Sequence, residues 1–213
     1  MPLLERDYMR RIAPKPPPWE EGGELGVVVA LLLANGVVFL LQLLGPPGEQ
    51  LTGFGVLQPR AVFQGQLWRL WTSTYLHSSP LHLLLNLLGL WFLGPPVERA
   101  WGGARFFAVY TVGGVLANVV LCLAAAGGWL PLATLALGAS GSVLTIVGAA
   151  AALYPALEVL LFGLLPMTLR TFALVFGGIY LVNALGQGPN YGGDLAHLTG
   201  LIIGAGWARF GPW

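Results

Sequence analysis

Six apolar stretches alternate with short polar segments along the 213 residues of the chain. A helix that crosses a bilayer needs about 20 mostly apolar residues, and most of these stretches approach that length. We therefore predict six spanning helices, at residues 25–44, 81–95, 105–126, 140–153, 167–186 and 193–209. The fourth is short for a full span, which suggests that it starts below the membrane surface.

Proline marks the expected ends of three of these helices, because it removes a helix hydrogen bond. Gly-Pro-Pro at 45–47 follows the first helix, Pro95 and Pro96 end the second, and Pro155 follows the fourth. Residues 156–166 are apolar and fit two arrangements. They either extend the fifth helix or form an extended loop under the bundle.

The composition also indicates a membrane protein. Only 9% of the residues are charged and 56% are hydrophobic, whereas soluble domains carry about 25% charged residues. A net charge of +1 argues against a nucleic-acid partner, which would require a basic surface. We expect an all-α, polytopic protein whose residues 25–213 form one six-helix domain. The proline-rich residues 1–24 should form a poorly ordered cytoplasmic segment that is not a secretory signal.

The basic residues predict the orientation of the bundle. By the positive-inside rule, the side with more Lys and Arg is cytoplasmic, which places both termini there. Only Arg60 and Arg69 fall on the outer side, in a long loop at 45–80 whose aromatic, weakly charged composition suits the membrane interface. Nine Arg to one Lys fits a bacterial source with a GC-rich genome. For a bacterial protein of this kind we expect the plasma membrane. The cytoplasmic basic residues are Arg6, Arg10, Arg11, Lys15, Arg99, Arg105, Arg170 and Arg209.

Polar side chains within a membrane are costly, so each is a candidate for function. In the predicted topology, His77, His82, His197 and Ser140 all lie near the outer ends of the spans. Asn86 follows His82 by four residues, which places both side chains on one helix face. Two hydrogen-bond donors directed at one small volume are what an oxyanion hole requires.

Ser140 lies in the sequence GASG at 138–141, which by itself is typical of helix packing. Gly200 and Gly204 give the sixth span a face that another helix can approach closely, and the fourth span has matching small residues at Gly141, Thr145 and Gly148. We expect Gly141 to let the sixth span approach, which would bring His197 near Ser140. An imidazole can take the proton of a serine hydroxyl and so activate it. At a helix start, unpaired backbone N–H groups would also stabilise negative charge.

Other catalytic patterns do not fit the chain. The hydrolase elbow G-x-S-x-G needs glycine where Ser142 stands. The zinc-protease motif H-E-x-x-H is absent, and so is a pair of facing Asp residues, so we expect no metal and no cofactor. A small transporter or channel with a His-Asn site remains an alternative, although it would need repeats or broken helices.

Several motifs together resemble the rhomboid intramembrane serine proteases. They are GASG at 138–141, HLLLN at 82–86, the G-x-x-x-A-H-x-x-G-x-x-x-G run at 192–204, LWR at 67–69 and LGPPVERAWG at 93–102. The resemblance covers roughly residues 25–209 and implies a rhomboid-like six-helix bundle. It also implies cleavage of single-pass membrane proteins near the outer face of the bilayer. An inactive member of the same fold, which binds membrane clients, is the other reading within the family.

The resemblance implies roles for individual residues. Ser140 would be the nucleophile and His197 the general base. The oxyanion hole would consist of His82, Asn86 and the backbone N–H of Ser140. Supporting roles would fall to Gly138, which shapes the site, to His77, which is structural or binds water, and to Arg69 and Glu98, which hold the loop and a helix turn.

One position departs from the family pattern. Many relatives carry an aromatic residue four positions after the serine, stacked on the catalytic histidine, whereas this chain has Leu144. A leucine packs against an imidazole but provides no ring face. Asp194 precedes His197 by three residues on the same helix, and we expect it to be poorly placed to complete a triad.

Overall fold

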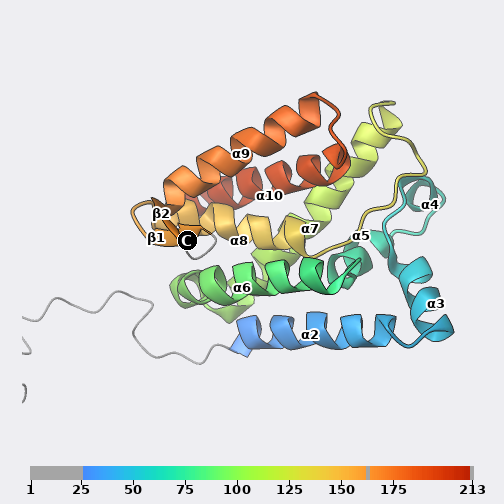
Figure 1. Ribbon diagram of the computed structural model, residues 1–213, viewed down its shortest axis with the longest axis horizontal. Coiled ribbons are helices and arrows are strands. Elements are labelled where there is room, and N and C mark those ends of the chain that lie inside the picture. The colour runs from blue at the N-terminus through green and yellow to red at the C-terminus, as the bar shows by residue number, and fades with distance from the viewer. Residues whose placement is uncertain (1–25, 162–163, 212–213) are drawn as a thin grey trace, which may run out of the picture.

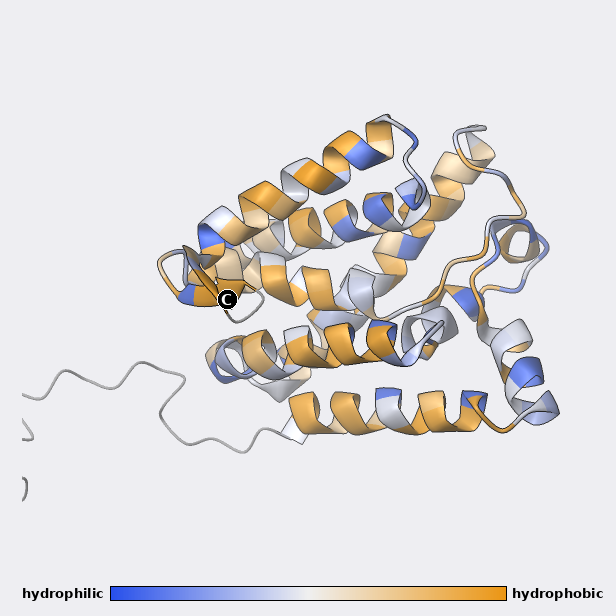
Figure 2. Ribbon diagram, in the orientation of Figure 1, coloured by the Kyte–Doolittle hydropathy of each residue, from blue (hydrophilic) through white to orange (hydrophobic). Residues whose placement is uncertain are grey.

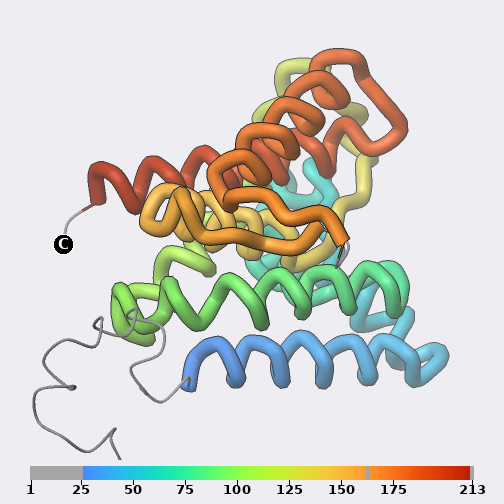
Figure 3. The backbone as a smooth tube through the Cα atoms, turned by 60° about the vertical axis from the view of Figure 1, so that its left-hand side comes forward, coloured from blue at the N-terminus to red at the C-terminus, as the bar shows by residue number. Residues whose placement is uncertain are grey.

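The computed structural model describes residues 26–161 and 164–211 and is mostly helical. The predicted N-terminal segment 1–24 therefore lies outside the described residues. Figures 1 and 3 show long helices side by side, with short helices gathered at one end. The elements are α2 (Gly26–Gln42), α3 (Pro46–Gly55), α4 (Pro59–Phe63), α5 (Arg69–Thr72), η2 (Ser73–Tyr75), α6 (Pro80–Trp101), α7 (Gly103–Ala126), α8 (Ser140–Leu153), β1 (Glu158–Leu161), β2 (Leu165–Thr168), α9 (Leu169–Leu185) and α10 (Tyr191–Phe210).

The long helices coincide with the six predicted apolar stretches, and Figure 2 shows hydrophobic residues along most of their length. By length and composition, α6 and α7 qualify as membrane spans. The helices α2, α8 and α9 are apolar but shorter, at 14 to 17 residues. Six complete crossings of the membrane therefore stay a prediction.

The predicted end of the second span at Pro95 and Pro96 is wrong, because α6 continues to Trp101. Each proline removes only its own N–H donor, and a helix packed among other elements tolerates the loss of single bonds. The Tyr154 hydroxyl, just after α8, donates to the carbonyl of Pro96 at 3.3 Å and so ties this turn of α6 to its neighbour. The helix instead stops at Gly102, whose positive φ of 76° reverses the chain at low cost for a glycine.

The turn of α6 beyond the two prolines holds the start of α2. The buried carboxylate of Glu98 accepts hydrogen bonds from the backbone N–H groups of Val27, at 2.9 Å, and Val28, at 3.0 Å. These N–H groups have no partner within their own helix because they lie in its first turn. Glu98 thus joins two helices, in keeping with the role that the resemblance implies.

The predicted loop at 45–80 contains the short elements α3, α4, α5 and η2. The Arg69 guanidinium donates to the carbonyls of Gly53, at 2.8 Å, and Val56, at 2.7 Å, and to the side chain of Gln66, at 2.7 Å. It therefore binds the end of α3 to the start of α5. The loop is a folded cap held by a charged side chain.

Residues 158–161 and 165–168 are extended, which agrees with the second of the two arrangements that the sequence left open. The strands β1 and β2 pair antiparallel, with Glu158 opposite Thr168 and Leu161 opposite Leu165. Residues 162–163, between the two strands, lie outside the described residues. Figure 1 places this hairpin at the end of the bundle away from α4.

The centre of the bundle is α8, in which nine of 14 residues are buried. Its backbone touches that of α10. A Cβ atom at Gly200 would overlap the carbonyl oxygen of Gly141, one at Gly204 that of Thr145, and one at Gly148 that of Leu201. The predicted glycine contact between the fourth and sixth spans is therefore present, and it brings the two backbones together.

The part of that prediction that concerned Gly141 is wrong. A Cβ atom at Gly141 would point toward α7, 3.1 Å from the Cβ of Ala117 and 3.8 Å from the Cα of Gly114. Its carbonyl oxygen, and not its missing side chain, faces α10. The reason is that α8 packs against both helices at once, so adjacent groups on one residue meet different neighbours.

We expect Gly204→Ala to lower the free energy of unfolding by about 1–3 kcal/mol, the usual cost of overpacking. Its Cβ would overlap the backbone of Thr145, which cannot rotate away. Gly206→Ala is the matched control on the same helix, since its Cβ would meet nothing within 4 Å. The measurement is thermal unfolding of the purified protein in detergent, and equal midpoints for the two variants would contradict the close contact.

Candidate active site

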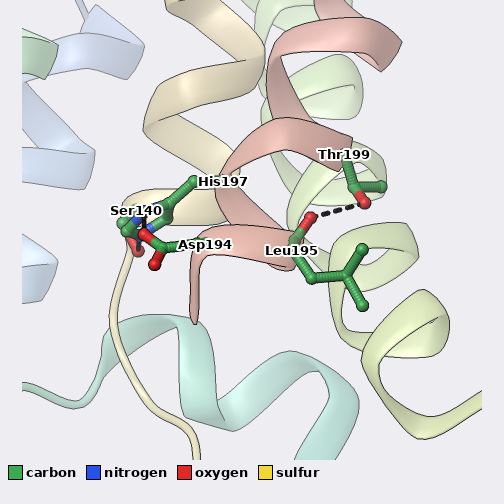
Figure 4. A network of polar contacts seen from close by, with 5 residues as sticks. All are labelled: Ser140, Asp194, Leu195, His197 and Thr199. Atoms are coloured by element: carbon green, nitrogen blue, oxygen red, sulfur yellow. Dashed lines mark hydrogen bonds and ion pairs between the residues drawn. The ribbon is translucent and has the colours of Figure 1, made fainter. Parts of the chain in front are cut away.

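Ser140 and His197 meet where α8 and α10 lie side by side. The Nε2 atom of His197 is 2.8 Å from the Oγ atom of Ser140, a hydrogen-bonding distance. Ser140 is the first residue of α8, and His197 lies in the second turn of α10 (Figure 4). The structure thus brings together the two residues that the sequence analysis placed at a common depth.

The chain enters α8 through a turn at Gly138. Its φ of 132° lies in a region that favours glycine, and its N–H donates to the carbonyl of Ser73 at 2.9 Å. Asn118 of α7 donates to the Ser73 hydroxyl, at 3.0 Å, and to the carbonyl of Leu70, at 2.8 Å. These bonds tie the segment before Ser140 to the cap.

Asn118 is a site residue that the sequence analysis missed. It is a polar side chain within an apolar predicted span, and the cost of such a residue in a membrane was a usable signal. It lines a cavity beside Ser140, together with Thr74, Gly138, Gly193 and other residues of the surrounding elements. The space next to the serine is therefore bounded by α7, α10 and the entering loop.

Gly138 also leaves room between Ser140 and His82. A Cβ atom at Gly138 would lie 2.7 Å from the Nε2 and Cε1 atoms of His82 and 3.6 Å from the Oγ of Ser140. The other ring nitrogen of His82, Nδ1, is 3.0 Å from the Ser78 hydroxyl. His82 therefore directs one edge of its ring toward the space beside the serine.

Asn86 is buried one turn along α6 from His82, as the four-residue spacing predicted. Its Nδ2 atom donates to the backbone carbonyl of His82 at 2.9 Å. An amide nitrogen carries two N–H bonds, and this contact uses one of them. The role of Asn86 in an oxyanion hole stays a prediction.

His77 is buried behind His82. Its ring packs edge-on against that of His82, with centroids 5.1 Å apart, and against Phe39 at 6.5 Å. Gln42 holds its backbone, accepting from the N–H at 2.9 Å and donating to the carbonyl at 3.3 Å. Burial, and secondarily the neighbouring His82, lower the pKa of His77 to about 4. His77 is therefore neutral near pH 7 and supports the His82 ring by packing.

The aromatic ring that contacts His197 comes from α9. The centroid of Tyr180 is 4.9 Å from that of His197, with an angle of 61° between the ring planes. Leu144 is only half-buried and packs against the core. The sequence analysis missed Tyr180, although the four-residue spacing of Phe172, Phe176 and Tyr180 marks an aromatic row on one helix face.

Asp194 lies beside His197 without a hydrogen bond to it. Its Oδ1 atom is 3.9 Å from the Nδ1 atom of His197 (Figure 4), which exceeds hydrogen-bonding distance. This agrees with the expected poor placement of a residue three positions away on the same helix. Within residues 26–161 and 164–211, no group of three or more His, Cys, Asp or Glu side chains is arranged to hold a metal ion.

Comparison with known proteins identifies the family. A family model described as "Rhomboid domain" matches residues 64–211. The chain is 35% identical over 107 residues to "RHOMBOID-like protein 5" of Arabidopsis thaliana, over 50% of this chain and 33% of that protein. It is 37% identical over 83 residues to "Rhomboid protease GluP" of Bacillus subtilis, over 38% of this chain and 16% of that protein.

A third relative carries a name that bears on activity. "Inactive RHOMBOID-like protein 8" of Arabidopsis thaliana is 33% identical over 82 residues, which are 38% of this chain and 23% of that protein. The matched segments thus span a third or less of each of these three relatives. Because the family match covers well over half of the sequence, from Gln64 to Gly211, the chain belongs to the rhomboid family.

Proposed function

We propose that this protein is an intramembrane serine endopeptidase that hydrolyses peptide bonds in or near transmembrane segments. The hydrogen bond of 2.8 Å between Ser140 Oγ and His197 Nε2 carries the proposal. A serine hydroxyl is a weak nucleophile at neutral pH, and an adjacent imidazole is the usual means of activating it. Membership of a family that includes proteins named as proteases supports the same chemistry.

In the proposed reaction, His197 takes the proton of Ser140 as its Oγ attacks the scissile carbonyl carbon. The tetrahedral intermediate then collapses, the C–N bond breaks, and His197 gives the proton to the leaving amine. Water next attacks the acyl-enzyme ester, again with His197 as base. The ester bond breaks, the acid product leaves, and Ser140 recovers its proton.

The negative charge on the intermediate would lie in the space that Gly138 leaves open. The backbone N–H of Ser140 points out of the first turn of α8, where N–H groups have no partner within the helix. His82 would add a donor if the Ser78 hydroxyl donates to its Nδ1 atom, because a neutral ring then carries its proton on Nε2. The second N–H of Asn86 would complete the oxyanion hole.

The proposed substrates are single-pass membrane proteins in the lipid bilayer. A transmembrane helix hides its carbonyl groups in backbone hydrogen bonds, so the substrate must unwind before Ser140 can attack. A site near the outer face of the plasma membrane, with both termini in the cytoplasm, would give access to the water that hydrolysis consumes. The distribution of basic residues supports this orientation.

Two other functions compete with this one. The first is a rhomboid-like protein without activity, and one relative is named as inactive. Such a protein would bind membrane clients without cutting them. The paired serine and histidine favour activity, because binding alone needs no such hydrogen bond. A small transporter or channel would need polar groups at the membrane midplane. A fluorophosphonate probe, which labels activated serines, distinguishes the protease from both.

We expect Ser140→Ala and His197→Ala each to abolish cleavage of a membrane substrate and labelling by the fluorophosphonate probe. The first removes the nucleophile and the second removes its base. Ser142→Ala is the matched control, since Ser142 is a buried serine two positions after Ser140 on the same helix, and this variant should keep the activity. Cleavage retained by the purified, folded Ser140→Ala or His197→Ala variant would refute the dyad.

Asn86→Ala should reduce kcat by roughly 10²–10³, the usual effect of losing one oxyanion donor. KM should change little, because the lost interaction forms only in the transition state. Initial rates over a range of substrate concentrations, in detergent, measure both constants. A wild-type kcat would remove Asn86 from the oxyanion hole, whereas a raised KM alone would place it in substrate binding.

Gly138→Ala should abolish labelling of Ser140, because its Cβ would overlap the His82 ring and occupy the proposed oxyanion space. Gly128→Ala is the matched control: Gly128 also has a positive φ, of 79°, but a Cβ there would meet nothing within 4 Å. The control should lose stability through backbone strain and keep its labelling. Equal labelling of the two folded variants would show that the space at Gly138 is not needed.

A further inference from the structure

The orientation of the His197 ring needs more than its hydrogen bond to Ser140. One hydrogen bond at Nε2 fixes the position of one ring atom and leaves the plane of the imidazole free to turn. Within the described part of the chain, the Nδ1 atom has no hydrogen-bond partner, since the carboxylate of Asp194 is 3.9 Å away. A contact against the ring itself must therefore hold its plane.

Tyr180 provides such a contact. Its ring meets that of His197 in an edge-to-face arrangement, with centroids 4.9 Å apart, a geometry that aromatic pairs favour. At position 144, on the neighbouring turn of α8, a leucine stands and offers no ring. Among the described residues, the ring contact of His197 is thus made from α9 and not from the helix that carries Ser140.

Tyr180 is itself held in place by its own helix and by α10. It ends the row in which Phe172 and Phe176 have centroids 4.4 Å apart and Phe176 and Tyr180 have centroids 6.3 Å apart. One turn further along α9, the side chain of Asn183 lies near the carboxyl group of Asp194, so α9 and α10 also approach each other there. Figures 1 and 3 show the two helices side by side.

We propose that Tyr180 is the positioning residue of His197, holding the imidazole plane so that Nε2 faces Ser140. The inference rests on the proposed function, because it assigns a role within that dyad. Tyr180 does not touch the reacting atoms and acts only through the histidine. Because only Leu169 and Ala184 are buried in α9, the orientation of the base depends on a helix at the edge of the bundle.

The test is the rate at which a fluorophosphonate probe labels Ser140 in the purified full-length protein in detergent. This rate reports on the activated serine without requiring a protein substrate. Tyr180→Leu should slow labelling by roughly tenfold, as expected when a catalytic group loses its orientation. Tyr180→Phe keeps the ring and should label at the wild-type rate. Ile179→Ala, at an exposed neighbouring position on α9, is the control for loosening of the helix.

A second-site variant separates positioning from a merely structural role. Leu144→Tyr in the Tyr180→Leu background places a ring on α8 and should restore most of the labelling rate. If Tyr180→Leu does not fold, as judged by thermal unfolding, Tyr180→Met serves in its place. Wild-type labelling by a folded Tyr180→Leu or Tyr180→Met variant would overturn the proposal, and so would equal slowing by Ile179→Ala. Failure of the wild-type protein to label would instead refute the proposed function.

Discussion

The close approach of the α8 and α10 backbones is the constraint on which the rest of the structure depends. Gly148, Gly200 and Gly204 allow it, because a Cβ atom at any of them would overlap a carbonyl oxygen of the facing helix. Ser140 and His197 lie 57 residues apart in the chain, and their hydrogen bond exists only because these helices touch. Packing with small residues is thus a precondition for the proposed chemistry.

Around this contact, polar side chains hold segments that the helices alone would leave free. Arg69 binds the carbonyls of the cap, and Asn118 binds the cap to α7. Glu98 accepts from the first N–H groups of α2. Within an apolar bundle, a polar group without a hydrogen bond is costly. The few polar side chains of this chain therefore bond to groups on neighbouring elements and so connect them.

Much of this arrangement could be predicted from residue patterns, and the exceptions have physical causes. The lengths of the apolar stretches indicated the long helices, yet Pro95 and Pro96 did not end α6, because a helix packed in a bundle tolerates the loss of single bonds. The spacing of His82 and Asn86 predicted a shared face. Gly141 was assigned to the wrong neighbour, since a sequence shows that a residue is small but not which helix it faces.

The sequence by itself determined the apolar helices and singled out the serine and the histidine as candidates, because these follow from composition and motif. Only the tertiary structure decided which side chains surround the imidazole. The ring at His197 comes from Tyr180 on α9, where the sequence pointed to the leucine at 144. The physical reason is that a contact between helices depends on how they are rotated against each other, and no single helix encodes that rotation.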